Sequence, residues 1–272
     1  MQYKKIFSAI AVCSSLFATS LSAAPILSDV IFVVDESGSM GNVQANLRSN
    51  IGLFASILTG TGQVDAQYGL VGYGNNLVVP RMVTDLTDPT TFATAALGLR
   101  TNGGTEPGYT ATAFALNALD GQTSLFSFRS NAVKNIIILT DEPSNGDRVN
   151  RGAVGGVAVS AAILDGVLTD NNALYNGVLR NTGTINSYST LITDHGGTVF
   201  NLNQFNTTDQ TVVQAFVTDF ANRKLQEIID FCRLNPNDPA CSGNQVPEPA
   251  SLALLGLGLF GLMAARRRSV LM

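Results

Sequence analysis

Oxygen-bearing side chains directly follow a short apolar run near the start of the chain. Val30–Val34 is typical of a buried β-strand, and Asp35-Glu36-Ser37-Gly38-Ser39 comes immediately after it. The carboxylate of Asp35 and the hydroxyls of Ser37 and Ser39 are hard oxygen ligands, which suit Mg²⁺, Ca²⁺ or Mn²⁺. Because buried parallel strands of α/β folds present their ligands at their carboxyl ends, we expect a cation site at this point.

Two later segments supply matching groups. Asn102-Gly103-Gly104-Thr105-Glu106 offers the Thr105 hydroxyl on a glycine-rich loop. Ile136–Thr140 reads as a second buried strand, and Asp141 follows it. We therefore expect Thr105 and Asp141 to complete the site.

The pattern Asp35-x-Ser37-x-Ser39, then Thr105, then Asp141 resembles the metal-ion-dependent adhesion site (MIDAS) of the von Willebrand factor type A (vWA) domain. All five positions are filled in the family's order. The likeness spans about residues 28 to 232, and it implies a doubly wound, Rossmann-like α/β fold.

The resemblance also implies a role for each residue. Ser37, Ser39 and Thr105 become direct ligands, while Asp35 and Asp141 act through bound water and supply negative charge. The family's ion is usually Mg²⁺, with Mn²⁺ or Ca²⁺ as alternatives. An ion held by neutral hydroxyls gains from a further anionic ligand, so the implied partner is a protein that offers a carboxylate.

Other interpretations of the same residues remain open. Ser39 could simply cap the following helix, with acid near its positive end. The segment 141–147 faintly resembles a calcium loop but lacks the alternating ligands and closing Glu of an EF-hand. We expect Glu36 to be solvated and Glu142 to be a loop charge, while Glu106 is equally consistent with orienting a ligand and with solvation.

Strands alternate with helices along the chain, which predicts a mostly parallel sheet covered on both faces. A glycine-containing turn at 74–76 predicts a hairpin and hence one antiparallel edge strand. The expected helices are 42–59, 88–97, 110–119, 157–168, 187–194 and 209–232, and the further expected strands are 66–73, 77–84, 133–140, 173–179 and 198–202.

Both ends of the chain have the composition of targeting segments. Residues 1–23 contain two lysines, an apolar stretch and small residues near Ala23, as in a secretory signal peptide. At the other end, an apolar span at 250–265 is followed by three arginines. Sixteen helical residues cover about 24 Å, slightly less than a bilayer core, and arginines that reach the interface can make up the difference.

The second end segment resembles the PEP-CTERM sorting signal of Gram-negative bacteria, with its motif at Val246, Pro247, Glu248 and Pro249. This likeness implies an exosortase-type sorting enzyme, transient anchoring in the inner membrane, and delivery to the outer surface or extracellular matrix. A plain single-span anchor is the alternative. The expected organisation is a signal peptide at 1–23, a vWA-like domain at 24–233, a linker at 234–246 and the sorting signal at 247–268.

Charge and cysteine content narrow the function further. Without the end segments, 11 basic and 19 acidic residues remain, for a net charge near −8, so a nucleic-acid partner is disfavoured. Cys232 and Cys241 could form a disulfide in an oxidising compartment, worth about 2–3 kcal/mol by loop entropy, or remain free thiols.

We therefore expect an exported, metal-dependent binding domain that makes adhesive or matrix contacts. The alternative is a structural matrix protein whose ion only stabilises the domain. A metal-dependent phosphatase is less favoured, because Ser37 stands where that chemistry needs a second acid. We expect no enzyme: no Gly-x-Ser-x-Gly elbow frames Ser37 or Ser39, and His195 reads as a helix-end residue.

Overall fold

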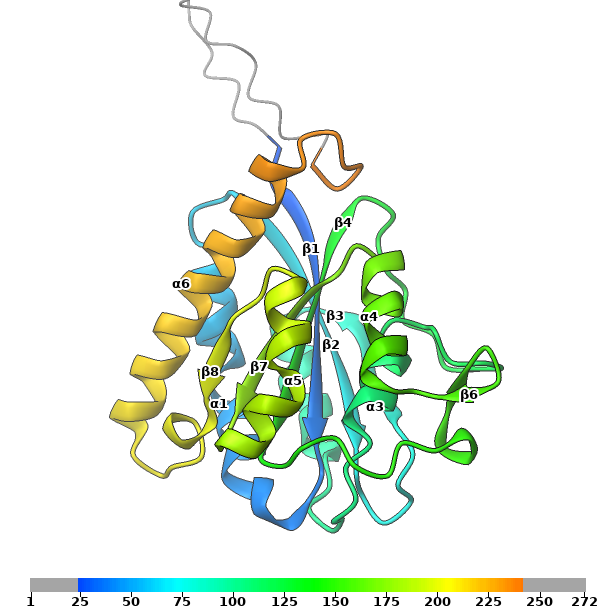
Figure 1. The fold of residues 1–272 in the computed structure, drawn as a ribbon. Coiled ribbons are helices and arrows are strands. Elements are labelled where there is room, and N and C mark those ends of the chain that lie inside the picture. The colour runs from blue at the N-terminus through cyan, green and yellow to red at the C-terminus, as the bar shows by residue number, and fades with distance from the viewer. Residues whose placement is uncertain (1–23, 242–272) are drawn as a thin grey trace, which may run out of the picture. The chain divides into compact units, whose positions relative to one another are not determined.

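A computed structural model describes residues 24–241, which form a six-stranded sheet flanked by helices (Figure 1). The sheet has the strand order β3-β2-β1-β4-β7-β8, and β5 and β6 form a separate small hairpin. The strands are β1 (Ile26–Asp35), β2 (Val64–Tyr73), β3 (Arg81–Thr87), β4 (Ala132–Thr140), β5 (Ala153–Val154), β6 (Val157–Ala158), β7 (Leu174–Leu179) and β8 (Val199–Asn201). The helices are α1 (Gly41–Thr59), α2 (Pro89–Ala95), α3 (Gly108–Ala115), α4 (Ala161–Asp170), α5 (Thr182–Asp194) and α6 (Gln210–Leu234). Single 3₁₀ turns cover Gly38–Met40, Ala96–Gly98, Val149–Arg151 and Leu202–Gln204.

The predicted fold class is confirmed. Strand β1 lies in the middle of the sheet and pairs in parallel with both β2 and β4. Parallel pairing continues through β7 to β8, while β3 is antiparallel to β2 at the edge. The carboxyl ends of β1, β4 and β7 therefore lie side by side at one end of the sheet.

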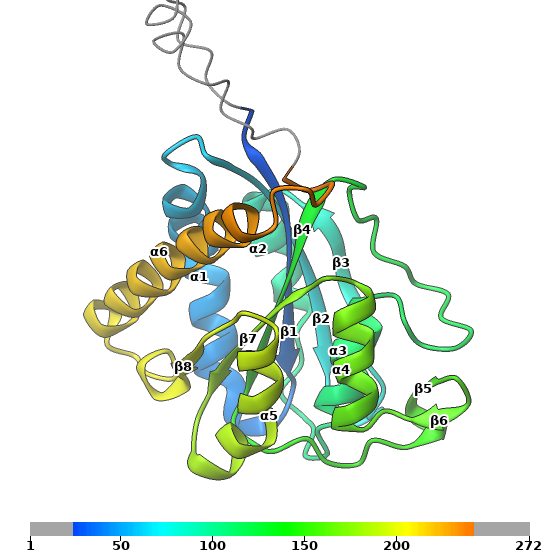
Figure 2. The same ribbon diagram turned by 45° about the horizontal axis from the view of Figure 1, so that its top comes forward.

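Helices cover both faces of the sheet, as Figure 2 shows. Alternation along β1 explains the two layers, because successive side chains of a strand point to opposite faces. Val30, Phe32 and Val34 belong to the core under α1, α2 and α6. Ile31 and Val33 belong to the core under α3, α4 and α5.

Side-chain caps set several helix starts. Asp88 accepts hydrogen bonds from the amides of Thr90 and Thr91 ahead of α2, with Pro89 at the first helical position. Asp209 caps α6 in the same way. Asn181 accepts from the amide of Thr184 and starts α5 at Thr182, five residues before the predicted start.

Two other boundaries differ from the prediction. The expected helix at 157–168 is wrong in its first turn, because Gly155 and Gly156 adopt positive φ and turn the β5–β6 hairpin. Ser160 then caps α4, which begins at Ala161. Strand β3 begins at Arg81 rather than at 77, since a seven-residue turn that includes Gly74 at φ 77° separates it from β2.

The predictions for the end segments fall outside the described residues. These are the signal peptide at 1–23, the sorting motif at 246–249 and the membrane span at 250–265. From residue 24 to residue 241, no helix combines the length and apolar character needed to cross a bilayer.

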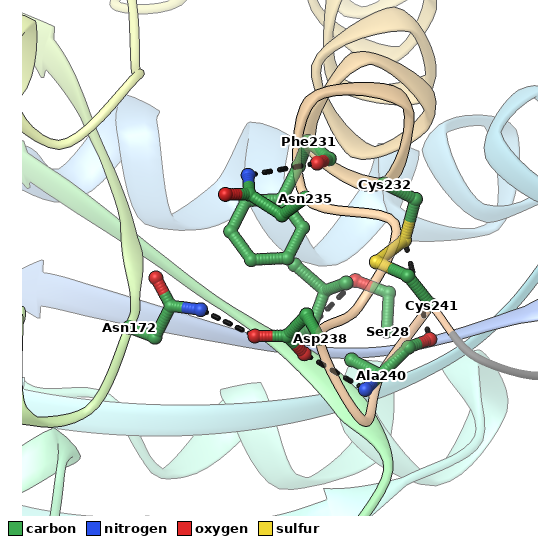
Figure 3. The surroundings of a disulfide bond; sticks show 9 residues. Ser28, Asn172, Phe231, Cys232, Asn235, Asp238, Ala240 and Cys241 are labelled. Carbon is green, nitrogen blue, oxygen red and sulfur yellow. Dashed lines mark hydrogen bonds between the residues drawn. A yellow bond between two sulfur atoms is a disulfide. The ribbon is translucent and has the colours of Figure 1, made fainter.

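Cys232 and Cys241 form a disulfide bond at the end of α6, with their Cα atoms 5.1 Å apart (Figure 3). The loop that it closes is fastened to the body of the domain by a hydrogen bond from Asn172 Nδ2 to Asp238 Oδ2 of 2.5 Å. This loop lies near Ser28, at the amino end of β1.

Candidate metal site at the carboxyl ends of the central strands

The two predicted aspartates lie at the carboxyl ends of neighbouring strands. Asp35 is the last residue of β1, and Asp141 directly follows β4. The register pairs Val34 with Leu139, so the strands end side by side. The Thr140 hydroxyl donates to Asp35 Oδ2 at 3.1 Å, which ties the two strand ends together.

The loop Glu36–Ser39, called the serine loop below, folds back over Asp35. The Ser37 amide donates to Asp35 Oδ1 at 2.7 Å, and the Ser37 and Ser39 hydroxyl oxygens lie 3.1 Å apart. Neither serine caps the helix that follows, since Gly38–Met40 and α1 both start without a side-chain cap. The cap interpretation of Ser39 is therefore wrong: its hydroxyl contacts that of Ser37, which lies beside Asp35.

The glycine-rich loop is bonded to the serine loop. Gly103 forms an isolated parallel bridge with Ser37, and the amides of Asn102 and Gly103 both donate to the Glu36 carbonyl. A Cβ placed on Gly103 would lie 1.5 Å from the Gly74 carbonyl oxygen, so only glycine allows this approach.

Thr105 lies where the three site loops meet. A Cβ placed on Gly74 would lie 3.3 Å from the Thr105 carbonyl oxygen and 3.5 Å from Asp35 Oδ1. On its other side, the Thr105 methyl group lies against Gly146 in the loop after β4. The structure thus brings all five predicted residues to one end of the sheet.

The carboxylates of this end are buried together. Burial raises the pKa of Asp35 to about 7, against hydrogen bonds from Ser37 that lower it, and the negative charge of Asp141 raises it further. Burial also raises the pKa of Glu106 to about 8, with contributions from Glu142 and Asp35. A nearby cation would favour the ionised form of each of these acids.

Asp141 has one satisfied and one unsatisfied oxygen. Its Oδ2 accepts from Arg180 Nη1 at 2.7 Å, while its buried Oδ1 has no hydrogen-bond partner within residues 24–241. An orphaned buried carboxylate oxygen beside Asp35 fits a metal ligand or a group that holds a bound water. The donor set thus fits the predicted cation.

The sequence alone did not indicate Arg180. Its guanidinium reaches the site from the end of β7, where the parallel sheet places it next to Asp141. An arginine that follows a short strand carries no distinct motif. Only the strand order reveals this contact.

The three glutamates near the site behave differently. Glu36 is fully buried, contrary to the solvated position predicted, because it forms an ion pair with Arg81 and accepts from Asn75 Nδ2 and the Arg100 amide. Glu106 is also buried and binds Asn145 Nδ2 at 3.0 Å. Glu142 is exposed, as expected for a loop charge.

Both carboxylate oxygens of Asp147, in the loop after Asp141, already accept hydrogen bonds from protein groups. Asp147 uses Oδ1 to accept from the amide and hydroxyl of Thr110, and Oδ2 to accept from the Ser144 hydroxyl. Asn145 joins this loop to Glu106. These contacts make the loop a support that fixes the position of Thr105.

Across residues 24–241, no three His, Cys, Asp or Glu side chains are grouped so that they could hold a metal ion. The candidate site differs from such a group, because three of its five members are hydroxyls. His195 is the sole histidine of the sequence and lies at the C-cap of α5, near the amino end of β7 and thus at the opposite end of the sheet. One of its ring nitrogens, Nε2, lies 2.9 Å from Asp165 Oδ1.

Comparison with known proteins places this chain in a family. The von Willebrand factor type A domain model matches residues 29–215, more than half of the chain, and a PEP-CTERM protein-sorting motif matches residues 245–268. The chain belongs to the vWA family. Members of this family generally mediate adhesion or protein–protein interaction.

No curated protein matches the sequence. Solved structures with a similar fold include proximal thread matrix protein 1 from the mussel byssus, with 15% identity and a TM-score of 0.48 over 71% of this chain and 49% of that chain. The SpRpn10 VWA domain has 14% identity and a TM-score of 0.49 over 73% and 95% of the two chains. The D319A mutant of the PilB minor pilin from Streptococcus sanguinis has 14% identity and a TM-score of 0.45 over 75% and 62%. The chain thus spans about half the length of the mussel protein, and these likenesses carry no argument about function.

The sorting motif bears on location. A PEP-CTERM signal implies export, sorting to the surface of a bacterial cell, and processing by an exosortase-type system. An exported protein reaches a compartment where disulfides persist, in agreement with the bond between Cys232 and Cys241.

Proposed function

We propose that this domain binds a divalent cation, with Mg²⁺ preferred over Mn²⁺ and Ca²⁺, and uses it to bind a carboxylate of a protein partner. Ser37, Ser39 and Thr105 supply neutral ligands, and Asp35 and Asp141 hold water and supply charge. The bound ion provides a Lewis-acidic position for the incoming carboxylate. The protein would act in adhesion at the outer surface or in the extracellular matrix of a Gram-negative bacterium, after transient anchoring in the inner membrane.

One observation carries this proposal. The Oδ1 atom of Asp141 is buried without a hydrogen-bond partner in the described part of the chain. Asp35 is also buried, and it lies close enough for the Asp141 charge to raise its pKa. Two buried carboxylates in this arrangement are costly unless a cation joins them.

Isothermal titration of the purified protein with MgCl₂ tests the proposal. We expect binding by the unchanged protein, and at least a tenfold loss of affinity in Asp141→Ala. The control is Asp219→Ala, which removes an exposed acid on α6 that pairs only with Arg223. Equal Mg²⁺ affinity in Asp141→Ala and the unchanged protein would contradict the ligand assignment.

A structural matrix protein, in which the ion only stabilises the fold, is the second candidate. The ion pair between Arg180 and Asp141 favours this second candidate, because Arg180 already neutralises part of the negative charge of the site without any partner. Capture of a carboxylate-bearing protein partner with Mg²⁺ and with EDTA, at a temperature where the metal-free domain stays folded, separates the two. Capture that does not change in EDTA would support the structural role.

We also propose that the site binds without turnover. His195 lies at the amino end of β7, and Asp141 lies next to the carboxyl end of the same strand. Six residues at about 3.3 Å each separate the two by roughly 20 Å, too far for proton transfer at the site. Hydrolysis of a chromogenic phosphate ester in Mg²⁺, abolished by Asp35→Asn, would overturn this.

A further inference from the structure

Three exposed arginines lie on the chain segments next to the candidate metal site. Arg100 precedes the glycine-rich loop, and its amide is fixed by Glu36 Oε1 at 2.7 Å. Arg148 follows Asp147 in the loop after β4, and Arg180 follows β7. All three side chains are exposed, and the segments that carry them lie at the end of the sheet where the site is.

The acids at this end of the sheet are mostly buried. Asp35, Glu36, Glu106 and Asp141 are at most 5% exposed. Glu142 and Asp209, which starts α6 beside the serine loop, are exposed acids in this region. The surface that a partner meets is therefore more positive than the net charge of the chain suggests.

Two of these arginines have no ion-pair partner. Within residues 24–241, neither Arg100 nor Arg148 forms a salt bridge, whereas Arg223 and Arg233 on α6 each pair with an aspartate. Arg180 donates to Asp141 through one of its guanidinium nitrogens, Nη1. Free donors thus remain for an anionic ligand.

An open groove of about 370 Å³ lies beside strand β3. Its lining includes Arg81, Met82, Phe114, Leu119 and Arg151, together with one exposed acid, Asp120. Both arginines link it to the site, since Arg81 pairs with Glu36 and Arg151 Nη1 donates to the Gly146 carbonyl at 2.5 Å. Gly146 in turn lies against Thr105.

We propose that the partner is a protein segment in which several acidic side chains flank an apolar one. This inference rests on the proposed function, because one of those acids would bind the metal ion. Further acids pair with Arg100, Arg148 and Arg180, and the apolar side chain enters the groove beside Met82 and Phe114. An acidic polysaccharide fits less well, since it offers carboxylates but no apolar side chain for the groove.

Fluorescence anisotropy with defined polymers tests this surface. The probes are a labelled copolymer of glutamate and tyrosine, poly-L-glutamate and polygalacturonate, each in Mg²⁺ and in EDTA. We expect the copolymer to bind most tightly, with affinity that falls in EDTA and at high salt. The double variant Arg100→Gln/Arg148→Gln should bind it about tenfold more weakly, as expected for two modest ion pairs.

The matched control is Arg223→Gln/Arg233→Gln, which removes the same charge from α6 and should leave polymer binding unchanged. If the two double variants bind equally, the arginine surface is not the docking site. If polygalacturonate binds as tightly as the copolymer, the partner is a polyanion of another class and the inference fails.

Mg²⁺ titration without polymer separates this failure from failure of the proposed function. Mg²⁺ binding without any copolymer binding would overturn the partner chemistry and leave the metal site standing. Absence of Mg²⁺ binding would overturn both.

Discussion

Asp35 combines a stabilising position with a destabilising charge. It accepts hydrogen bonds from Ser37 and Thr140, yet it is fully buried with a raised pKa and a second carboxylate nearby. Under the proposed function, the metal-free fold is therefore destabilised at Asp35, and the bound cation would offset this cost.

Asp35→Asn should separate these two effects. The amide keeps an acceptor for Ser37 and removes the buried charge, so the free energy of unfolding in EDTA at pH 8 should rise by about 1–3 kcal/mol. The same variant should lose its stabilisation by Mg²⁺. Chemical denaturation with and without Mg²⁺ measures both. A variant less stable than the unchanged protein in EDTA would show that the Asp35 charge is already compensated.

The raised pKa of Asp35 predicts how stability depends on pH. Without a cation, the pKa of Asp35 is 3.8 in the unfolded chain and about 7 in the folded protein. Between these pH values, the unfolded state therefore binds fewer protons than the folded state. Stability in EDTA should fall as pH rises through this interval, by a few kcal/mol at most.

A bound cation favours the ionised carboxylate, so the stabilisation by Mg²⁺ should grow from pH 5 to pH 8. Differential scanning fluorimetry at constant ionic strength measures the difference in Tm between Mg²⁺ and EDTA at each pH. Asp35→Asn should flatten this dependence. An equal Mg²⁺ shift at all pH values would argue that Asp35 does not change its protonation on binding.

At the scale of elements, the site depends on the contact between two loops from different parts of the sequence. Gly103 carries this contact, since its backbone lies between Ser37 and the turn after β2. Neighbouring Gly104 is exposed, and a Cβ placed on it meets nothing within 4 Å. The chain thus offers a matched pair of glycines.

Gly103→Ala should lower the free energy of unfolding by at least about 2 kcal/mol and weaken Mg²⁺ binding, because the Gly74 backbone must move. Gly104→Ala should change neither the free energy of unfolding nor the free energy of Mg²⁺ binding by more than about 0.5 kcal/mol. Thermal unfolding and Mg²⁺ titration of both variants test this. Similar behaviour of the two would mean that the loops are not in close contact.

The sequence predicted elements better than their junctions. The apolar run at Val30–Val34 and the glycine-containing turn at 74–76 are local patterns, and they correctly indicated β1 and the antiparallel pairing of β2 with β3. The β5–β6 hairpin was missed because two glycines outweigh a helix-like apolar pattern at 157–168. The five candidate site residues were predicted from a motif, whereas burial of Glu36 and the contact of Arg180 depend on pairing across the sheet.

On the scale of the whole molecule, the disulfide and the candidate site lie at opposite ends. Replacing both Cys232 and Cys241 by Ser should lower the free energy of unfolding by about 2–3 kcal/mol, because the open chain gains entropy when unfolded. Mg²⁺ affinity should not change, since β1 separates the two regions by ten residues. Denaturation and Mg²⁺ titration check these outcomes; a weakened Mg²⁺ affinity would reveal coupling along α6.

The described chain begins and ends at the same end of the molecule, at the top of Figure 1, while β1 points away from it towards the serine loop. A partner that pulls on Asp35, Ser37 and Ser39 against a tether beyond Cys241 would apply tension roughly parallel to the strands, across about 30 Å of sheet. Strand β1 is held on both sides, by ten paired residues of β2 and eight of β4. Pulling it out would require these ladders to shear together rather than unzip one hydrogen bond at a time, a geometry suited to mechanical resistance.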